Sequence, residues 1–349
     1  MRAMILKEFR QLRRDRRTLA LMIVQPIVLL VVFGYAASFD VDGAPTLVVG
    51  VEAAEVVDGL PDFFEVTETR PDEGRADAVD ALRRGEVAAA IVADRSAPAL
   101  LLDGSELFTA RSAVTLVSRM ENAPEPEVLF NPDLETPPIM VPAIAGMILV
   151  FIGTIVTSLG VVRERQAGTM EQLAVMPLRP RDVFVGKIAP YFLVAALDLA
   201  IVLFAGIWIF GVPFEGSWLT MGTGALLFLF VTLGLGVLIS TVSENQGQAI
   251  QLALIALLPQ ILLSGMMFPL EAMPAAIRWI GYALPLTYFI DIARGVMVRG
   301  APFDSLLVPL GMLALLGLVV FSLAVLRFRR DLAPTGEASP ARSATAEAA

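Results

Sequence analysis

The chain has 349 residues, a formal net charge of -9, 56% hydrophobic residues and a mean hydropathy of +0.72. Soluble globular domains are less apolar, so most of the chain is expected to lie in lipid. The sequence contains neither Cys nor His, which excludes disulfides, thiol nucleophiles, imidazole bases and the usual zinc or haem ligands. We therefore expect no catalytic residue, no metal and no cofactor on this chain.

Residues 1–18 form a basic amphipathic segment, and the first apolar run follows it at 19–38. Six runs are long enough to cross a hydrocarbon core of about 30 Å. They cover residues 19–37, 139–162, 188–210, 218–242, 249–268 and 303–328. The sequence predicts an α-helical polytopic membrane protein with six transmembrane helices.

Lys and Arg in short loops mark the cytoplasmic side of a membrane protein. Basic residues crowd the first 17 positions, follow the second run and follow the last run. This distribution predicts that both termini are cytoplasmic, and the basic start is a topology signal, so no nucleic-acid partner is expected. Arg278, Arg294 and Arg299 depart from the pattern, because they fall between the fifth and sixth runs on the outer side.

The first run also has features of a cleavable signal peptide, with a basic start and small residues at Ala36 and Ala37. Signal peptides use an apolar stretch of about 7–15 residues, and this run is longer. We expect a retained membrane anchor, and the orientation of the other runs is the same in either case.

Residues 39–138 are polar and acidic, and they predict an α/β domain outside the membrane on the extracytoplasmic side. Strands are expected at 46–51, 87–93 and 99–102, helices at 75–84 and 108–120, and an extended linker at 121–138. One helix before this domain and five after it give a 1+5 layout for residues 139–330. The tail at 331–349 is rich in Ala, Ser, Pro and Glu, which predicts a disordered cytoplasmic segment.

A short amphipathic helix is expected on the cytoplasmic side after the second run. Arg163 and Glu164 open this segment, Gly168 can break the chain and Thr169 can cap a helix. Its other notable positions are the apolar Met170 and Leu173, the charged Glu171 and the terminating Pro177. Such a helix can rest on lipid headgroups or dock to a protein.

Three separated blocks resemble the ABC-2 type transporter permeases of prokaryotic exporters. They run from Lys7 to Tyr35, from Arg163 to Lys187 and from Leu263 to Gly300. The family often has Pro where Arg16 stands and Asn where Leu284 stands, and neither departure touches the segment after the second run. The order of the blocks and the large insert after the first run make the combination specific.

This resemblance implies a function for two segments. Residues 163–177 would be a coupling helix that seats in a separate ABC-type ATP-binding subunit, which would hold ATP and Mg. Residues 269–300 would form short re-entrant helices that cap the pathway externally, with Pro269, Pro274, Pro285, Tyr288 and Arg294 as gate residues. A plain hairpin or two further spans are alternatives, but residues 277–288 are too short to span and are interrupted by Gly and Pro.

The resemblance also implies a dimer, either of this chain or with a similar permease, with membrane lipid around it. The single Lys in the first 180 residues and the many Ala, Arg and Val indicate GC-rich coding DNA, so we expect the plasma (inner) membrane of a prokaryote. Asp198 lies in the middle of the third run, where an ionisable group is a candidate for pathway lining or for helix packing. Gln25, Gln251 and Gln260 are weaker pathway candidates, and interhelical hydrogen bonding is their alternative role.

We expect a permease that exports an amphipathic or hydrophobic substrate such as a drug, lipid or glycan, driven by a separate ATPase subunit. The chain has no phosphate-binding loop of the G-x-x-x-x-G-K-[ST] type, which is consistent with ATP hydrolysis on another chain. The alternative is a receptor or sensor that reads ligands through residues 39–138. An intramembrane enzyme is disfavoured, because H-E-x-x-H is impossible without His and no G-x-S-x-G motif occurs.

Overall fold

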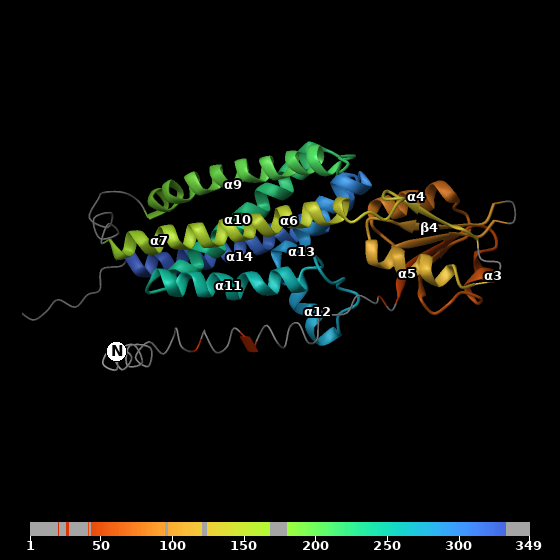
Figure 1. Cartoon of the computed structure of the whole chain (residues 1–349), viewed down its shortest axis with the longest axis horizontal. Helices are drawn as coiled ribbons and strands as arrows, with labels where there is room; N and C mark the ends of the chain where they lie inside the picture. The colour runs from red at the N-terminus through yellow and green to blue at the C-terminus, as the bar shows by residue number, and fades with distance from the viewer. Residues whose placement is uncertain are drawn as a thin grey trace, which may run out of the picture.

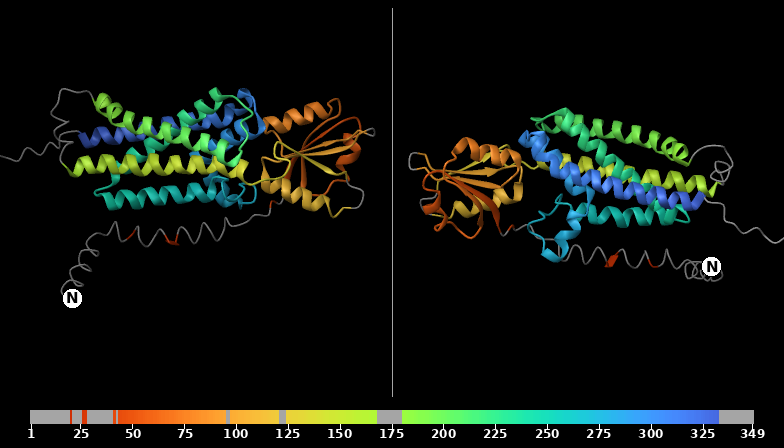
Figure 2. Two further views of the ribbon diagram at one scale, coloured as in Figure 1. Left: turned by 45° about the horizontal axis from the view of Figure 1, so that its top comes forward. Right: turned by 180° about the vertical axis from the view of Figure 1, so that it is seen from behind.

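The computed structural model describes residues 20, 26–27, 41, 43–94, 97–120, 124–167 and 180–332, with side chains from 189 to 327 in the last range. The basic segment, almost all of the first apolar run and the tail lie outside the described residues. Figure 1 shows two parts, a bundle of long helices and an α/β part at one end of it. The two further views in Figure 2 show the same arrangement.

The α/β part contains a five-stranded sheet in the order β2-β1-β3-β4-β5. Its strands are β1 (Ala44–Val49), β2 (Phe64–Arg70), β3 (Ala89–Val92), β4 (Ala99–Asp103) and β5 (Pro126–Leu129). β1 is parallel to both β2 and β3, β3 is antiparallel to β4, and β4 is parallel to β5.

Helices cover both faces of this sheet. Because side chains alternate along a strand, Leu47 and Val49 of β1 pack on the side of α4 (Arg75–Arg84). Val48 points the other way, toward α3 (Ala53–Val57) and α5 (Leu107–Val117). The α/β part therefore has a core on each side of the sheet.

The expected strands and helices of this part overlap β1, β3, β4, α4 and α5. The sequence did not predict α3, β2 or β5. β2 has mostly exposed or half-buried side chains, so its pattern lacks the apolar alternation that indicates a strand.

The expected linker at 121–138 contains β5 and a tightly held turn. Asn131 is buried, and its side chain donates to the carbonyls of Gly104 and Glu135 and accepts from the Glu135 amide. Arg111 of α5 donates to the Leu134 carbonyl at 2.7 Å. These bonds fix the chain where it enters the bundle, so an extended linker was the wrong interpretation of this stretch.

Five helices in the described part of the chain are long and apolar enough to cross a membrane. The first is continuous over Pro137–Gln166 and consists of α6 (Pro137–Phe151), the π-helical segment η1 (Ile152–Val156) and α7 (Thr157–Gln166). The others are α9 (Pro180–Phe210), α10 (Trp218–Val242), α11 (Gln246–Leu263) and α14 (Leu307–Leu332), the last preceded by a short 3₁₀ turn, η3 (Phe303–Leu306). Span 218–242 coincides with the prediction, whereas α11 ends at Leu263 instead of residue 268.

Helix α10 occupies the middle of the bundle and packs against the other long helices. Small residues permit this: a Cβ atom added to Gly236 would stand 2.7 Å from the Gly153 carbonyl oxygen of η1. Close backbone approach through glycine is typical of helices that pack in membranes.

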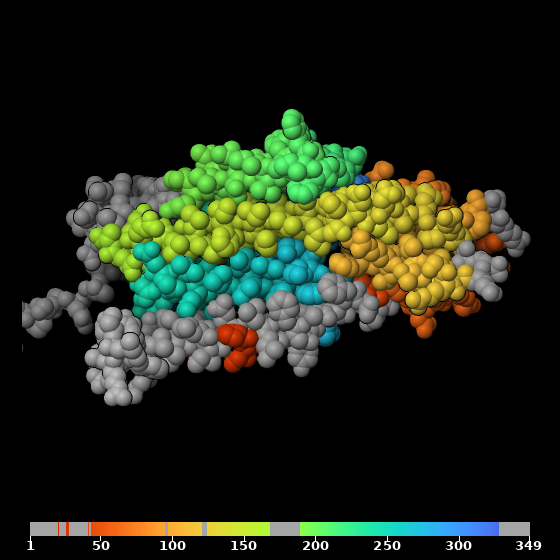
Figure 3. All heavy atoms as spheres, in the orientation of Figure 1, coloured from red at the N-terminus to blue at the C-terminus, as the bar shows by residue number. Residues whose placement is uncertain are grey.

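Helix α9 lies on the outside of the bundle, as the space-filling view in Figure 3 shows. Its outer face carries Leu193, Leu197, Ile201 and Trp208, which are between 58% and 89% exposed. A continuous exposed apolar face of this kind belongs in contact with lipid or with another protein.

Candidate functional site

The region where the α/β part meets the bundle contains most of the buried charge of the described chain, and we name it the junction. From the α/β part it comprises residues 103–109. From the bundle it comprises residues 264–274, α12 (Ala275–Tyr282), α13 (Pro285–Arg294) and the π-helical segment η2 (Gly295–Arg299).

Two prolines begin the two short helices of the junction. Pro274 is the N-cap of α12, and Pro285 is at the first turn of α13, where its missing N–H costs no hydrogen bond. The buried side chain of Gln260 on α11 accepts from the Leu286 amide at 3.3 Å, which satisfies another free amide of α13. Phe289 is fully buried against the long helices, so α13 is an integral part of the packing at this end of the bundle.

Arg299 at the end of η2 joins the two parts. Its side chain is 4% exposed. Nη1 lies 3.3 Å from Ser105 Oγ and 3.5 Å from Asp103 Oδ2. The same nitrogen lies 3.9 Å from Glu106 Oε1, and Nη2 donates to Asp291 Oδ1 at 3.2 Å. One guanidinium therefore bridges the end of β4 and helix α13, which is the fork geometry that suits arginine.

Gly85, at the end of α4, lets this guanidinium approach. Its φ is +71°, and an added Cβ would stand 2.9 Å from Arg299 Nη2. A second ion pair between the two parts joins Arg84 Nη2 to Asp304 Oδ2 at 2.5 Å on the surface. The α/β part is thus held to the bundle by one buried and one exposed charge contact.

Burial shapes the protonation of these groups. Loss of water raises the pKa of Asp103 to about 6, although Arg299 opposes the rise. Burial alone would lower the pKa of Arg299, but the carboxylates of Asp103, Asp291 and Glu106 raise it overall. The cluster therefore has enough negative charge to keep the guanidinium charged.

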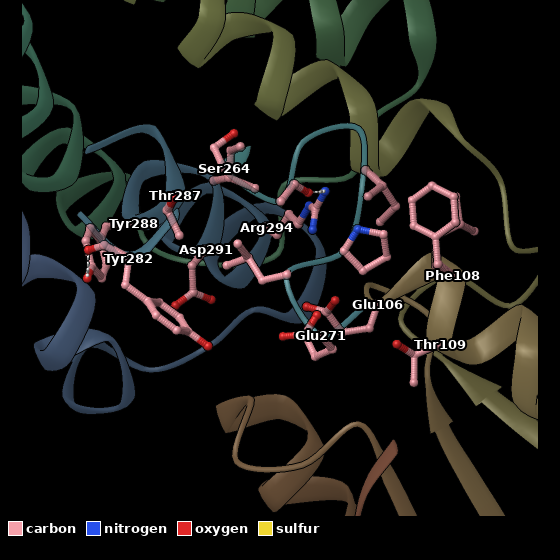
Figure 4. Close-up of a pocket in the computed structure, with 16 residues that line it drawn as sticks. Glu106, Phe108, Thr109, Ser264, Glu271, Tyr282, Thr287, Tyr288, Asp291 and Arg294 are labelled. Carbon is pink, nitrogen blue, oxygen red and sulfur yellow. Dashed lines mark hydrogen bonds between the residues drawn. The ribbon is translucent and has the colours of Figure 1, made fainter. Parts of the chain in front are cut away.

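Beside this cluster lies a cavity of about 260 Å³, shown in Figure 4. Glu106, the N-cap of α5, and Phe108 in its first turn line one side of the cavity. Ser264 and Glu271 line it from residues 264–271, and Arg294 lines it from α13. Asp291, Tyr282 and Tyr288 stand on the side of α12 and α13. The wall contains both aromatic and charged groups of both signs.

Arg294 and Glu271 have no ion-pair partner within 4 Å among the described residues. Arg294 is 8% exposed and donates through Nη2 to the Gly265 carbonyl at 3.3 Å, but its buried Nε has no acceptor in the described part of the chain. Burial lowers the pKa of Arg294, against the attraction of Glu106. Glu271 is accessible at the cavity, yet the surrounding protein removes enough water to raise the pKa of its carboxyl, and Glu106 adds to the rise.

The structure brings together three of the five proposed gate residues, because Pro269, Tyr288 and Arg294 line this one cavity. Pro274 and Pro285 lie outside its wall and start the helices that position it. The re-entrant character of the segment stays a prediction, which two short, consecutive helices at one end of the bundle support.

The proposed coupling segment is described only at its start. Arg163 and Glu164 are in the last turns of α7. The neighbouring Arg165 donates to the Ser240 and Ser243 carbonyls at the end of α10, which caps that helix with a positive charge. Gly168, Thr169, Met170, Glu171, Leu173 and Pro177 lie outside the described residues, so their role stays a prediction.

The pathway candidates do not come together at one point with the gate residues. Asp198 is half-buried on α9, and its Oδ2 has no hydrogen-bond partner in the described part of the protein. Gln251 Oε1 on α11 has none there either. Gln260 makes the interhelical bond to α13 described above, and Gln25 lies outside the described residues.

Sequence reasoning missed the cluster around Arg299, and one signal could have found it. Arg294 and Arg299 are basic residues on the side predicted to be external, against the usual rule. Both are buried in the junction, so their charge is used for local packing and carries no topological information. A basic residue that breaks the loop-charge pattern was therefore the available clue.

Long apolar helices, lipid-facing side chains and a polar α/β part at one end define a multi-pass membrane protein, and comparison with known proteins agrees. The chain matches the family described as ABC-2 family transporter protein over residues 16–326. It is 31% identical over 336 residues to the probable multidrug ABC transporter permease YbhS of Escherichia coli (strain K12), covering 86% of this chain and 88% of the relative. It is 29% identical over 360 residues to the probable multidrug ABC transporter permease YbhR of the same strain, covering 94% and 98%. The chain belongs to the ABC-2 family of transporter permeases.

Proposed function

We propose that the chain is the membrane-spanning permease subunit of an ATP-binding cassette exporter that is driven by a separate ATPase subunit. The observation that carries this proposal is the family match across residues 16–326 in a chain without a phosphate-binding loop of its own. The relatives named as probable multidrug permeases favour an amphipathic or hydrophobic substrate.

The proposed orientation puts the α/β part on the extracytoplasmic side and both termini in the cytoplasm of a prokaryotic cell. Arg163 and Arg165 at one end of the bundle and the acidic α/β part at the other support it. The first apolar run, 19–38, would supply a sixth membrane helix and complete the 1+5 layout.

We infer that a second permease, either another copy or a similar chain, completes the pathway, as the family resemblance implies. The exposed apolar side chains along α9 and α14 leave ample surface for such a partner and for lipid. The junction cavity, with Tyr288 and Arg294 in its wall, would then lie at the external end of each half of the pathway.

The decisive test of this proposal is whether residues 163–177 contact the ATPase subunit. Glu171→Lys in the assembled transporter should weaken assembly with the ATPase, since loss of a buried charged contact costs roughly 2–5 kcal/mol. Co-purification of the ATPase and substrate-stimulated ATP hydrolysis in liposomes should both fall, with membrane insertion intact. Glu55→Lys, an equal charge reversal on the exposed face of α3, is the matched control and should retain both. Wild-type values for Glu171→Lys would show that residues 163–177 rest on lipid.

A further inference from the structure

The junction cavity offers two unsatisfied charges of opposite sign to whatever enters it. Asp291 is paired with Arg299 at 3.2 Å, and Glu106 is 3.9 Å from the same guanidinium. Arg294 and Glu271 remain without an ion-pair partner among the described residues. Arg294 is buried, where a charge without an ion-pair partner is costly, and Glu271 is exposed at the cavity. Both side chains can therefore pair with a charged group that enters the cavity.

The hydrogen-bond donors and the carboxylates of the junction cavity lie on different sides of it. Figure 4 shows the Arg294 guanidinium beside the 264–271 segment, with the carboxylates of Glu106 and Glu271 close to one another on the neighbouring side. Ser264 is 1% exposed and also lines the cavity, and its Oγ has no partner in the described chain. Arg294 Nε and the Ser264 hydroxyl can donate to an anionic oxygen, whereas the two carboxylates can accept from or attract an ammonium group.

The volume of the cavity and its position relative to the membrane surface restrict the ligand further. A volume of about 260 Å³ is below the roughly 300–1,000 Å³ of sites that enclose a drug-sized molecule, so it fits a head group. All three tryptophans of the chain, Trp208, Trp218 and Trp279, are exposed. Trp208 is near the end of α9, Trp218 begins α10 and Trp279 is in α12 of the junction. The loop between α9 and α10 reaches η2 of the junction, where the Glu215 amide donates to the Met297 carbonyl. Exposed tryptophans of this kind mark the level of lipid headgroups.

We propose that the junction cavity binds the zwitterionic head group of an amphipathic molecule, with its anionic oxygens at Arg294 and Ser264 and its ammonium group at Glu106 and Glu271. Tyr282, Tyr288 and Phe108 line the same space with aromatic rings, which favour both the ammonium group and the start of an apolar tail. A resident bilayer phospholipid and a transported amphiphile share this chemistry. As a statement of substrate class the inference rests on the proposed function, but as a binding site it does not.

The test uses three lipids that share their dioleoyl tails and differ in the charges of the head group. Phosphatidylcholine has both charges, O-ethylphosphatidylcholine keeps only the ammonium, and phosphatidylglycerol keeps only the phosphate. Each is titrated into the purified full chain in a neutral detergent, and bound lipid is measured by native mass spectrometry. The wild-type chain should hold phosphatidylcholine roughly tenfold tighter than either single-charge lipid, as expected for charge-assisted contacts that the others cannot make.

Glu106→Gln/Glu271→Gln should reduce the affinity for phosphatidylcholine roughly tenfold, to the level of phosphatidylglycerol. Glu55→Gln/Asp58→Asn removes the same charge from exposed positions on and just after α3 and should keep the wild-type ranking. Equal wild-type affinity for all three lipids, or equal behaviour of the two double variants, would overturn the proposal. If the first double variant does not fold, Glu271→Gln alone carries the test, because this side chain is exposed.

A second arm separates the two sources of the ligand. In liposomes that contain the permease with its ATPase, ATP-dependent movement of a fluorescent phosphatidylcholine that Glu106→Gln/Glu271→Gln abolishes identifies the head group as part of the substrate. Tight binding without movement, in a complex that exports another compound, identifies a resident lipid. If the wild-type complex moves nothing, the proposed function fails, while the ranking of the three lipids still decides the binding site.

Discussion

The α/β part and the helix bundle bury their apolar residues by the same rule but present opposite surfaces. The outside of the α/β part carries ion pairs, such as Arg75 with Glu127 at 2.6 Å. The outside of the bundle carries Leu197 and Trp208, which are 61% and 89% exposed. The difference is the one that water around the α/β part and lipid around the bundle would require. At the junction the charged side chains of Asp103 and Arg299 are shielded from water by the surrounding protein, and Arg299 pairs there with Asp103 and Asp291.

The largest expected effect comes from breaking the contact between the two parts. Arg299→Gln leaves the fully buried Asp103 without its main counter-charge, and removal of one partner of a buried pair costs about 3–5 kcal/mol. The thermal unfolding midpoint of the purified chain should fall by many degrees. Arg84→Gln removes the exposed contact with Asp304, which solvent screens, so this control should leave the midpoint unchanged. An equal fall of the unfolding midpoint in the two variants would mean that the buried contact of Arg299 stabilises the protein no more than the exposed contact of Arg84.

A charge on the surface of each part tests the difference in solvent directly. Leu197→Arg puts a guanidinium on the apolar face of α9, where insertion scales give a cost of about 2.5–3.5 kcal/mol near the bilayer centre. Val51→Arg puts the same group on the α/β part at a position that is 90% exposed, and it should be neutral. The yield of folded protein from membranes checks both. Normal yield of Leu197→Arg would show that this face of α9 lines water.

The long apolar helices were predictable because period and length are properties of the chain alone. Trp218–Val242 begins after an N-cap serine, Ser217, whose hydroxyl accepts from the Leu219 amide, and both ends coincide with the prediction. Helix α11 ends early because Ser264 and Gly265, with φ of +81°, turn the chain while the sequence stays apolar to Phe268. A run of apolar residues indicates that a segment lies in lipid, but it does not indicate where the helix ends within that run.

The charged contacts of the junction could not be predicted, because they join residues far apart in sequence. Asp103 and Arg299 are separated by 196 positions. Arg299 lies in the third resemblance block, but Asp103 lies in no block, so the resemblance does not pair them. Sequence resemblance selected Tyr288 and Arg294 for a gate, and the structure places both in one cavity wall. The partner residues Glu106 and Glu271 belong to different parts of the fold, so only the packing of α5 against the bundle brings them to this cavity.

The half-buried Asp198 is a carboxylate inside the bundle, and it can be compared with the carboxylates of the α/β part. Its Oδ2 has no partner in the described residues, unlike the carboxylates of the α/β part, most of which face water. Asp198→Asn should preserve insertion, because a neutral amide is less costly in lipid than a carboxylate, and it should change the rate or range of transport several-fold if the carboxylate lines the pathway. ATP-driven transport of several amphipathic dyes in liposomes measures this. Unchanged transport of all of them would assign Asp198 to helix packing.

The smallest expected effect is a pH dependence that separates Asp103 from the surface carboxylates. Its pKa is raised to about 6 by burial, above the value of about 3.9 in an unfolded chain. The folded state therefore binds this proton more tightly than the unfolded state does, so the contribution of Asp103 to stability is present at low pH and is lost as the pH rises through 6. Between pH 7 and pH 5 the gain is about 1 kcal/mol. Surface carboxylates act in the opposite direction: the hydrogen bond from Arg70 lowers the pKa of Glu68, so Glu68 contributes stability at higher pH.

Asp103→Asn removes only the pH-dependent contribution of Asp103. The unfolding midpoint of the wild type should therefore rise relative to that of the variant as the pH falls. A difference that stays constant from pH 8 to pH 5 would mean that Asp103 is already charged and fully compensated by Arg299.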